Sequence, residues 1–142
     1  MELKSYRAAI SVSDLNTLSH WYQKVLGFQL SRQIDFDNYG VHIHILELNG
    51  FGLELIEKQG AKSKKERMPD LEDGTLLHGF TKIAFFVEDI DILADKLKEN
   101  NVKVIFDITD DPDDNLSWMI IEDPDGNVIQ FFSEIQPLDL CI

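Results

Sequence analysis

Two histidines alternate along one apolar stretch, and a glutamate follows them a few residues later. His42 and His44 lie within the segment 41–45 and Glu54 within the segment 51–58. Side chains alternate along a strand, so the two imidazoles share one face. Two imidazoles and one carboxylate are a donor set for divalent metals such as Zn, Ni, Fe or Mn. The metal site is one interpretation of this pattern. The other is that the histidines are half-buried hydrogen-bonding residues or line an organic ligand.

Other catalytic arrangements have little support. No serine or cysteine stands in a nucleophile motif, which argues against acyl transfer, and no Gly-rich phosphate loop is present. The segment Asp125-Gly126-Asn127 resembles a calcium loop in composition only, because the further acidic residues that such a loop requires are missing. We interpret it as a turn.

The elements that must position these residues form an internal repeat. The segment 9–15 (AISVSDL) returns as 84–90 (AFFVEDI), and 49–56 (NGFGLELI) returns as 125–132 (DGNVIQFF). The first pair is offset by 75 residues and the second by 76. One module of this length has therefore been duplicated almost without insertion.

Each module reads as a strand, a helix and three more strands. In the first module, Ser13 or Asp14 caps the helix, Gly27 ends it, and Asn49-Gly50 is a hairpin turn. In the second, Asp89 caps the helix and Asn100-Asn101 ends it. The predicted strands are 5–12, 28–36, 39–48 and 51–58, then 80–87, 102–106, 115–121 and 127–134.

The predicted fold class is α+β, with two tandem βαβββ modules forming a curved mixed sheet around a central cavity. We expect a single domain over 1–142, with module 1 at about 1–58, module 2 at about 79–135 and a short C-terminal tail. Residues 59–78 are charged and without periodicity, which predicts a linker or lid with no element of its own.

Charge is divided unevenly along the 142 residues, whose formal net charge is −13. Residues 1–69 hold 9 basic and 8 acidic side chains, and residues 70–142 hold 4 and 18. This balance argues against nucleic-acid binding and favours a cationic ligand, unless the acids only solvate loops. The single Cys141 cannot form an internal disulfide, and no apolar run is long enough for a membrane span. We expect a cytoplasmic protein.

Two longer motifs resemble a known family. The segment 14–28 (DLNTLSHWYQKVLGF), the segment 123–131 (DPDGNVIQF) and the duplicated module are similar to the glyoxalase, bleomycin-resistance and extradiol-dioxygenase superfamily, also called vicinal oxygen chelate proteins. The resemblance covers essentially the whole chain. It implies the fold, but not one reaction, because the superfamily includes lyases, epimerases, dioxygenases, thiol transferases and drug-binding proteins.

Metal-dependent members of that family carry four ligands, one on the first and one on the last strand of each module. The resemblance transfers these positions to Arg7, Glu54, Lys82 and Gln130. Only Glu54 is a good ligand, because arginine is always protonated and lysine usually is. We therefore predict no metal at these positions and no cofactor.

Two interpretations of this departure stay open. Arg7 beside Glu54 would form a cross-strand ion pair, and Lys82 beside Gln130 a charge-assisted hydrogen bond, so that internal partners fill the place of the metal. Alternatively, the two cations hold a carboxylate or phosphate of a ligand.

Aromatic residues on the predicted strands are candidates for the cavity lining. If Glu54 and Gln130 point into the cavity, Phe132 does so too, while Leu53, Leu55, Ile129 and Phe131 face the helices as core. The parity of the other aromatic residues on the strands cannot be assigned from the sequence: Phe51, Phe85, Tyr39 and Trp118.

Two functions fit these residues. The first is a glyoxalase/bleomycin-resistance-like protein that binds a small organic ligand between the modules through Arg7, Lys82, Gln130, His42, His44, Trp118 and Phe132, without the metal. The alternative is a glyoxalase-class lyase or isomerase, similar to lactoylglutathione lyase, in which a divalent metal is required and Glu54 is the catalytic residue. The resemblance also implies a homodimer.

Overall fold

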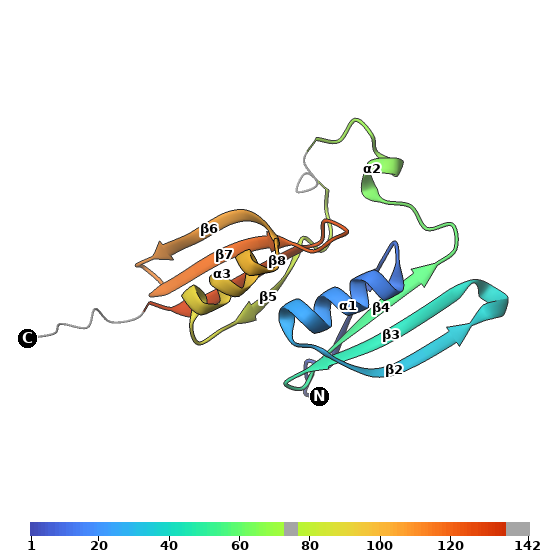
Figure 1. Cartoon of the computed structure of the whole chain (residues 1–142), viewed down its shortest axis with the longest axis horizontal. Helices are drawn as coiled ribbons and strands as arrows, with labels where there is room; N and C mark the ends of the chain where they lie inside the picture. Colours follow the sequence, from blue (N-terminus) through green and yellow to red (C-terminus); the bar gives the residue numbers. More distant parts are fainter. Residues whose placement is uncertain (73–76, 136–142) are drawn as a thin grey trace, which may run out of the picture. The chain divides into compact units, whose positions relative to one another are not determined.

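The computed structural model describes residues 1–72 and 77–135, and it divides into two compact units, Met1–His78 and Gly79–Ile142 (Figure 1). The first unit contains β1 (Arg7–Ser11), α1 (Leu15–Leu26), β2 (Gln29–Phe36), the 3₁₀ turn η1 (Asp37–Tyr39), β3 (Val41–Leu48), β4 (Phe51–Lys58) and α2 (Lys64–Arg67). The second contains β5 (Lys82–Phe86), α3 (Ile90–Glu99), β6 (Lys103–Asp111), β7 (Leu116–Glu122) and β8 (Val128–Glu134).

The two sheets have the same topology. Their strand orders are β1-β4-β3-β2 and β5-β8-β7-β6. In each, the first strand runs parallel to the last, and the remaining neighbours are antiparallel. The described residues therefore hold eight strands in two mixed four-stranded sheets, which confirms the predicted α+β class and the two βαβββ modules. That the modules make one domain stays a prediction.

The two long helices begin at the predicted caps. The Asp14 side chain accepts a hydrogen bond from Thr17 N at 2.8 Å, and the Asp89 side chain accepts from Asp91 N and Ile92 N. Each cap satisfies backbone N–H groups that the first helical turn leaves without partners. Helix α1 ends at Gly27, whose φ of 80° is the left-handed conformation that glycine adopts without steric cost.

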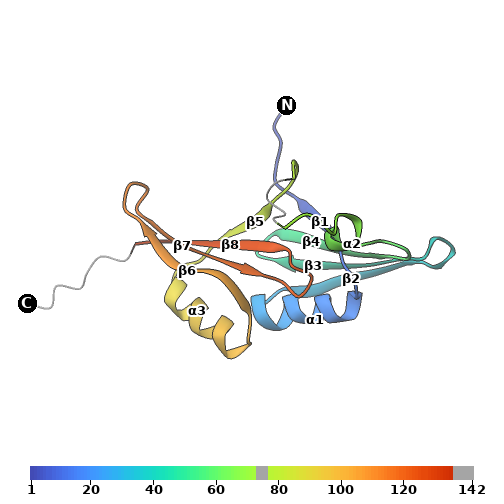
Figure 2. The same ribbon diagram turned by 90° about the horizontal axis from the view of Figure 1, so that it is seen from above.

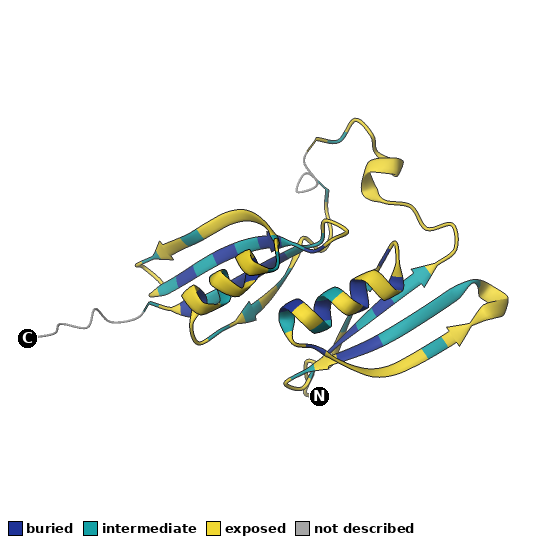
Figure 3. Cartoon of the chain, in the orientation of Figure 1, coloured by how far each residue is buried: buried dark blue, intermediate teal, exposed yellow. Residues whose placement is uncertain are grey.

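One face of each sheet packs against a helix to form the core (Figure 3). In the first unit α1 lies on β3 and β4, and Leu18 and Tyr22 are buried with Leu53 and Leu55. Ile129 and Phe131 are buried in the same way in the second unit, where α3 packs against β6 and β8. These burials confirm the predicted parity of β4 and β8. We call the sheet face turned away from α1 or α3 the open face of that unit; Figure 2 shows each helix along the other side of its sheet.

Two turns fix the register of the strands. Asn49 and Gly50 both have positive φ, 49° and 82°, as a two-residue hairpin requires, and they pair Leu48 with Phe51. In the second unit the Asp123 side chain accepts hydrogen bonds from Asp125 N, Asn127 N and Asn127 Nδ2. The segment 123–127 is therefore a turn, as predicted.

Four expectations need correction or fall outside the described residues. The linker does contain an element, because Ser63 and Glu66 form a capping box that starts the short helix α2. Tyr39 lies in η1 and not in a strand, and β6 runs on to Asp111. Cys141 lies outside the described residues. Within the described ranges, no helix is long and apolar enough to cross a membrane.

Candidate functional site

An ion pair joins the first and last strands of the first unit on its open face. Arg7 Nη1 of β1 donates to Glu54 Oε1 of β4 at 2.8 Å, and the two side chains are 27% and 26% exposed. The hydrogen bond to Glu54 raises the pKa of the Arg7 guanidinium above its ordinary value, more than desolvation lowers it. The cross-strand ion pair of the first interpretation is therefore present, and the Glu54 carboxylate already has a cation beside it.

The neighbours of Arg7 hold its side chain in this direction. Arg7 Nη2 donates to the Tyr6 hydroxyl at 3.0 Å, and the guanidinium carbon lies 4.6 Å from the centre of the Tyr6 ring. Arg7 also stands opposite Gly52 in the parallel register, and a Cβ at position 52 would meet Arg7 Cγ at 2.7 Å. The guanidinium can therefore cross β4 towards Glu54 because residue 52 has no side chain.

The second unit repeats this arrangement with different residues. Lys82 Nζ of β5 donates to Gln130 Oε1 of β8, and Gln130 is 5% exposed. Lys82 pairs with Val128 in the register, and its partner Gln130 is two residues further along β8, just as Glu54 is two residues beyond Gly52. The predicted hydrogen bond is confirmed, and the two pairs occupy equivalent places in the repeat.

The residues at these four positions do not fit a divalent metal. A guanidinium carries five N–H donors and no acceptor, and the ammonium of Lys82 donates to the only oxygen that Gln130 could offer to a metal. Glu54 supplies a single carboxylate, paired with Arg7. In residues 1–72 and 77–135, no group of three His, Cys, Asp or Glu side chains could hold a metal ion.

The donor set of His42, His44 and Glu54, one of the two interpretations of the alternating histidines, does not form. In the antiparallel register of β3 and β4, Glu54 pairs with Ile45, whereas His44 pairs with Leu55. Paired residues share a face, so both histidines lie on the face turned towards α1 and Glu54 lies on the open face. The interpretation that places these three side chains around one metal is therefore wrong.

The two histidines have opposite environments. His42 Nδ1 lies 2.7 Å from Asp35 Oδ1, and this hydrogen bond raises the pKa of the imidazole. Desolvation lowers the pKa of His44, whose Nδ1 is buried and has no hydrogen-bond partner among the described residues. Near them, Glu57 Oε2 accepts from Leu15 N at 2.6 Å, at the start of α1. A ligand-binding role for His42 and His44 stays a prediction, separate from the open-face site.

Aromatic side chains lie next to one another on the open face of the second unit. Trp118 of β7 pairs with Phe132 of β8, and Phe132 pairs with Phe86 of β5. On the other side Phe106 of β6 meets Trp118 edge to face, with ring centroids 5.9 Å apart. Phe86 is 62% and Phe106 54% exposed. This row of rings is a surface on which a flat organic molecule can stack.

Several members of these groups were not identified from the sequence. Tyr6 and Gly52 support Arg7, and Phe86 and Phe106 extend the aromatic row. The signal for Phe86 was the repeat itself, because Phe86 follows Lys82 by four residues on a strand and so shares its face. Phe106 had no such signal, since β6 shifts register between Val104 and Phe106 and again before Thr109.

Comparisons with known proteins agree on one fold. The model of the family described as Glyoxalase/Bleomycin resistance protein/Dioxygenase superfamily matches residues 6–131. A glyoxalase family protein from Enterococcus faecalis is 20% identical with a TM-score of 0.77, over 92% of this chain and 97% of that one. The trypanothione-dependent glyoxalase I of Leishmania major is 22% identical with a TM-score of 0.70, over 94% and 88%. Glyoxalase I from Zea mays is 18% identical with a TM-score of 0.74, over 94% and 45%.

Proposed function

Because the chain belongs to the Glyoxalase/Bleomycin resistance protein/Dioxygenase superfamily, we propose that it binds a small organic ligand on the open faces of its sheets, without a metal at the superfamily's four ligand positions. The observation that carries this proposal is the pair of internal contacts, Arg7 with Glu54 and Lys82 with Gln130. At these four positions the side chains bind one another, so they leave no set of donors for a divalent ion.

The side chains on the two open faces indicate which kind of ligand would bind. In the second unit the row of Phe86, Phe132, Trp118 and Phe106 favours a flat apolar body. Residues 70–142 carry 18 acidic and 4 basic side chains, so positive charge on that ligand would be attracted. In the first unit Glu54 remains 26% exposed, and its carboxylate can accept a further hydrogen bond from a ligand donor.

The metal-dependent lyase or isomerase is less well supported. It needs Glu54 as a metal ligand or proton-transfer base, and the residues at the three companion positions are an arginine, a lysine and an amide. The Glu54 carboxylate is also already engaged by the Arg7 guanidinium, at 2.8 Å.

A thermal-shift screen with cationic antibiotics, thiol conjugates and divalent metals tests the proposal. We expect organic compounds to raise the melting temperature and metals alone to leave it unchanged. The shift should disappear in Trp118→Ala and in Glu54→Gln and persist in the control Glu134→Gln, which changes an exposed carboxylate at the end of β8. Stabilisation by a metal alone, lost in Glu54→Gln, would favour the lyase.

We also propose that the protein is a cytoplasmic homodimer. Exposed apolar side chains outside the aromatic row, such as Ile92 and Ile105, support association, because burying them removes apolar surface from water. Sedimentation at micromolar concentration should give a species of about twice the monomer mass of 16.3 kDa. A species at the monomer mass alone would contradict this part of the proposal.

A further inference from the structure

A hollow of about 760 Å³ lies in the first unit, at the end of β1. Three segments of the chain line it. Ser11 is the last residue of β1, and Gly60 and Ala61 follow β4. Lys62 lies shortly before α2, and Glu66 and Arg67 lie within α2. Ser11 shares a face of β1 with Arg7, because the two residues are four apart on one strand. The hollow therefore opens on the open face, and Figure 2 shows α2 on the side of the sheet away from α1.

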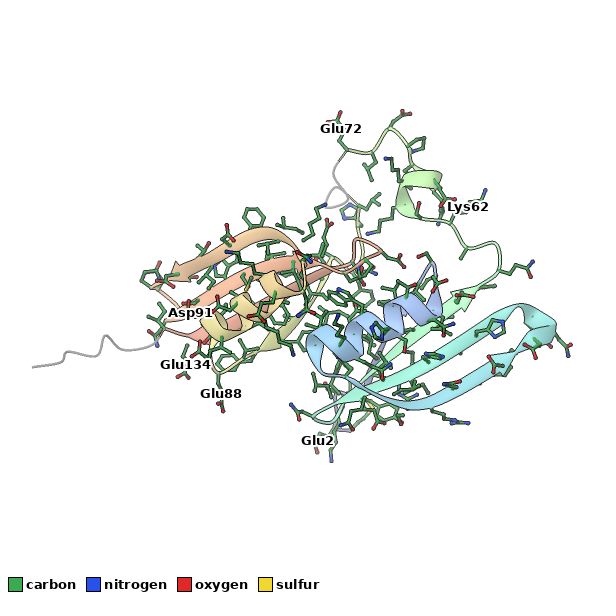
Figure 4. All side chains as sticks on the ribbon, viewed as in Figure 1. Glu2, Lys62, Glu72, Glu88, Asp91 and Glu134 are labelled. Atoms are coloured by element: carbon green, nitrogen blue, oxygen red, sulfur yellow. The ribbon has the colours of Figure 1, made fainter. Side chains whose placement is uncertain are left out.

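The charged side chains that line this hollow differ in whether they already have a hydrogen-bond partner. The Glu66 carboxylate is part of the capping box and accepts from Ser63 N at 3.4 Å. The side chains of Lys62 and Arg67 form no hydrogen bond or ion pair with another residue in the described ranges. Figure 4 shows Lys62 beside α2. The hollow thus holds two cations available to a ligand and one carboxylate that the backbone already uses.

This positive hollow stands out against the charge of the chain. The protein carries a formal net charge of −13, yet four of its 13 basic side chains lie within residues 62–67. A guanidinium, an ammonium and the Ser11 hydroxyl are all hydrogen-bond donors, and the first two are the side chains that recognise carboxylate and phosphate oxygens. Lys62 and Arg67 line the hollow as donors, and its one carboxylate, Glu66, is already used by the capping box, so the lining matches an anionic ligand.

We propose that the hollow lined by Ser11, Lys62 and Arg67 binds an oxyanion, a carboxylate or a phosphate group of a small molecule. The site is distinct from the Arg7–Glu54 pair, because four residues of extended strand separate Ser11 from Arg7 by roughly 13 Å. Neither Arg7 nor Glu54 lines the hollow. The proposal therefore goes beyond the proposed open-face ligand and can fail or succeed independently of it.

An NMR titration of the full chain tests the site. Amide shifts are followed while sodium phosphate, and in a separate arm sodium succinate, replaces sodium chloride at constant ionic strength. We expect saturable shifts at Ser11, Gly60 and Ala61 in at least one arm, and the stronger arm identifies the group. The double variant Lys62→Gln/Arg67→Gln should weaken binding by about tenfold or more, since it removes two charged donors.

Lys64→Gln/Lys65→Gln is the matched control. It removes the same charge from the same segment, residues 62–67, but neither residue lines the hollow, so binding should stay within about twofold of the wild type. Glu66→Gln should strengthen binding by roughly two- to fivefold, because glutamine preserves the capping box while the negative charge is lost. Two results would overturn the proposal: amide shifts that never saturate, or equal weakening of anion binding in both double variants. Either would mean that the protein only attracts anions in general.

Discussion

The side chain of Arg7 lies across the backbone of Gly52, where an added Cβ would stand 2.7 Å from Arg7 Cγ and 3.2 Å from Arg7 Nε. Such a contact is too short to persist, so Gly52→Ala must displace the arginine side chain. We expect the coupling free energy between Arg7→Met and Glu54→Gln to fall when the double-mutant cycle is repeated in the G52A background.

The equivalent position in the second module provides the control for this change. Val128 already carries a side chain opposite Lys82, so Val128→Ala should leave the Lys82–Gln130 hydrogen bond in place. An unchanged Arg7–Glu54 coupling in the G52A background would show that the arginine reaches Glu54 without needing the glycine.

Glu54→Gln separates a structural from a functional role of the carboxylate. Both side chains of the Arg7–Glu54 pair reach water, and exposed ion pairs contribute little to folding. We expect urea unfolding to show only a small loss of stability, while binding of the compounds found by the thermal-shift screen is abolished. A large loss of stability, together with unchanged binding, would make Glu54 a purely structural residue.

The histidines should give opposite pH dependences in urea unfolding measured from pH 5 to pH 8. His44 has a lowered pKa in the folded state, so its contribution to stability is present above about 6.5 and is lost as the pH falls. His42 has a raised pKa, so its contribution is present below about 6.5 and is lost as the pH rises through the folded value. His44→Leu should therefore reduce the acid loss, and His42→Gln the alkaline loss. Curves parallel to the wild type would contradict both assignments.

Much of the fold could be predicted because short sequence motifs mark where its helices and strands begin and end. Aspartates at the helix starts, glycine at the end of α1 and the 75-residue repeat place most elements within a few residues. The short helix α2 was missed because its capping box, Ser63 with Glu66, precedes a charged segment and not an apolar periodic one.

It was harder to predict which residues of β3 share a face with Glu54, although the sequence contained the information. Along β3 apolar residues and histidines alternate, so neither face is clearly the polar one. The two-residue turn Asn49-Gly50 nevertheless fixes the pairing: Leu48 opposite Phe51 leads to Ile45 opposite Glu54 and to His44 opposite Leu55. Counting back from the turn would have separated the histidines from Glu54.

Asp123→Ala should destabilise the second unit. Asp123 is 3% exposed and accepts hydrogen bonds from Asp125 N at 2.9 Å and from Asn127 N at 2.9 Å. A hydrogen bond to a charged acceptor contributes about 1.5 to 3 kcal/mol, so we expect a loss of that order. Urea unfolding of this variant and of the exposed control Asp114→Ala provides the measurement. Equal stability of the two variants would mean that water replaces the carboxylate.

Metal binding by the wild type and by a variant with the superfamily's ligands restored tests the central claim. The triple variant Arg7→His/Lys82→His/Gln130→Glu puts two imidazoles and a second carboxylate at the positions that now hold the two internal pairs. Both proteins are purified without chelator, analysed by elemental mass spectrometry and titrated with zinc. We predict stoichiometric zinc in the triple variant and none above background in the wild type. One tightly bound metal ion per wild-type chain, lost on Glu54→Gln, would contradict the claim that Arg7 and Lys82 have taken the place of the metal.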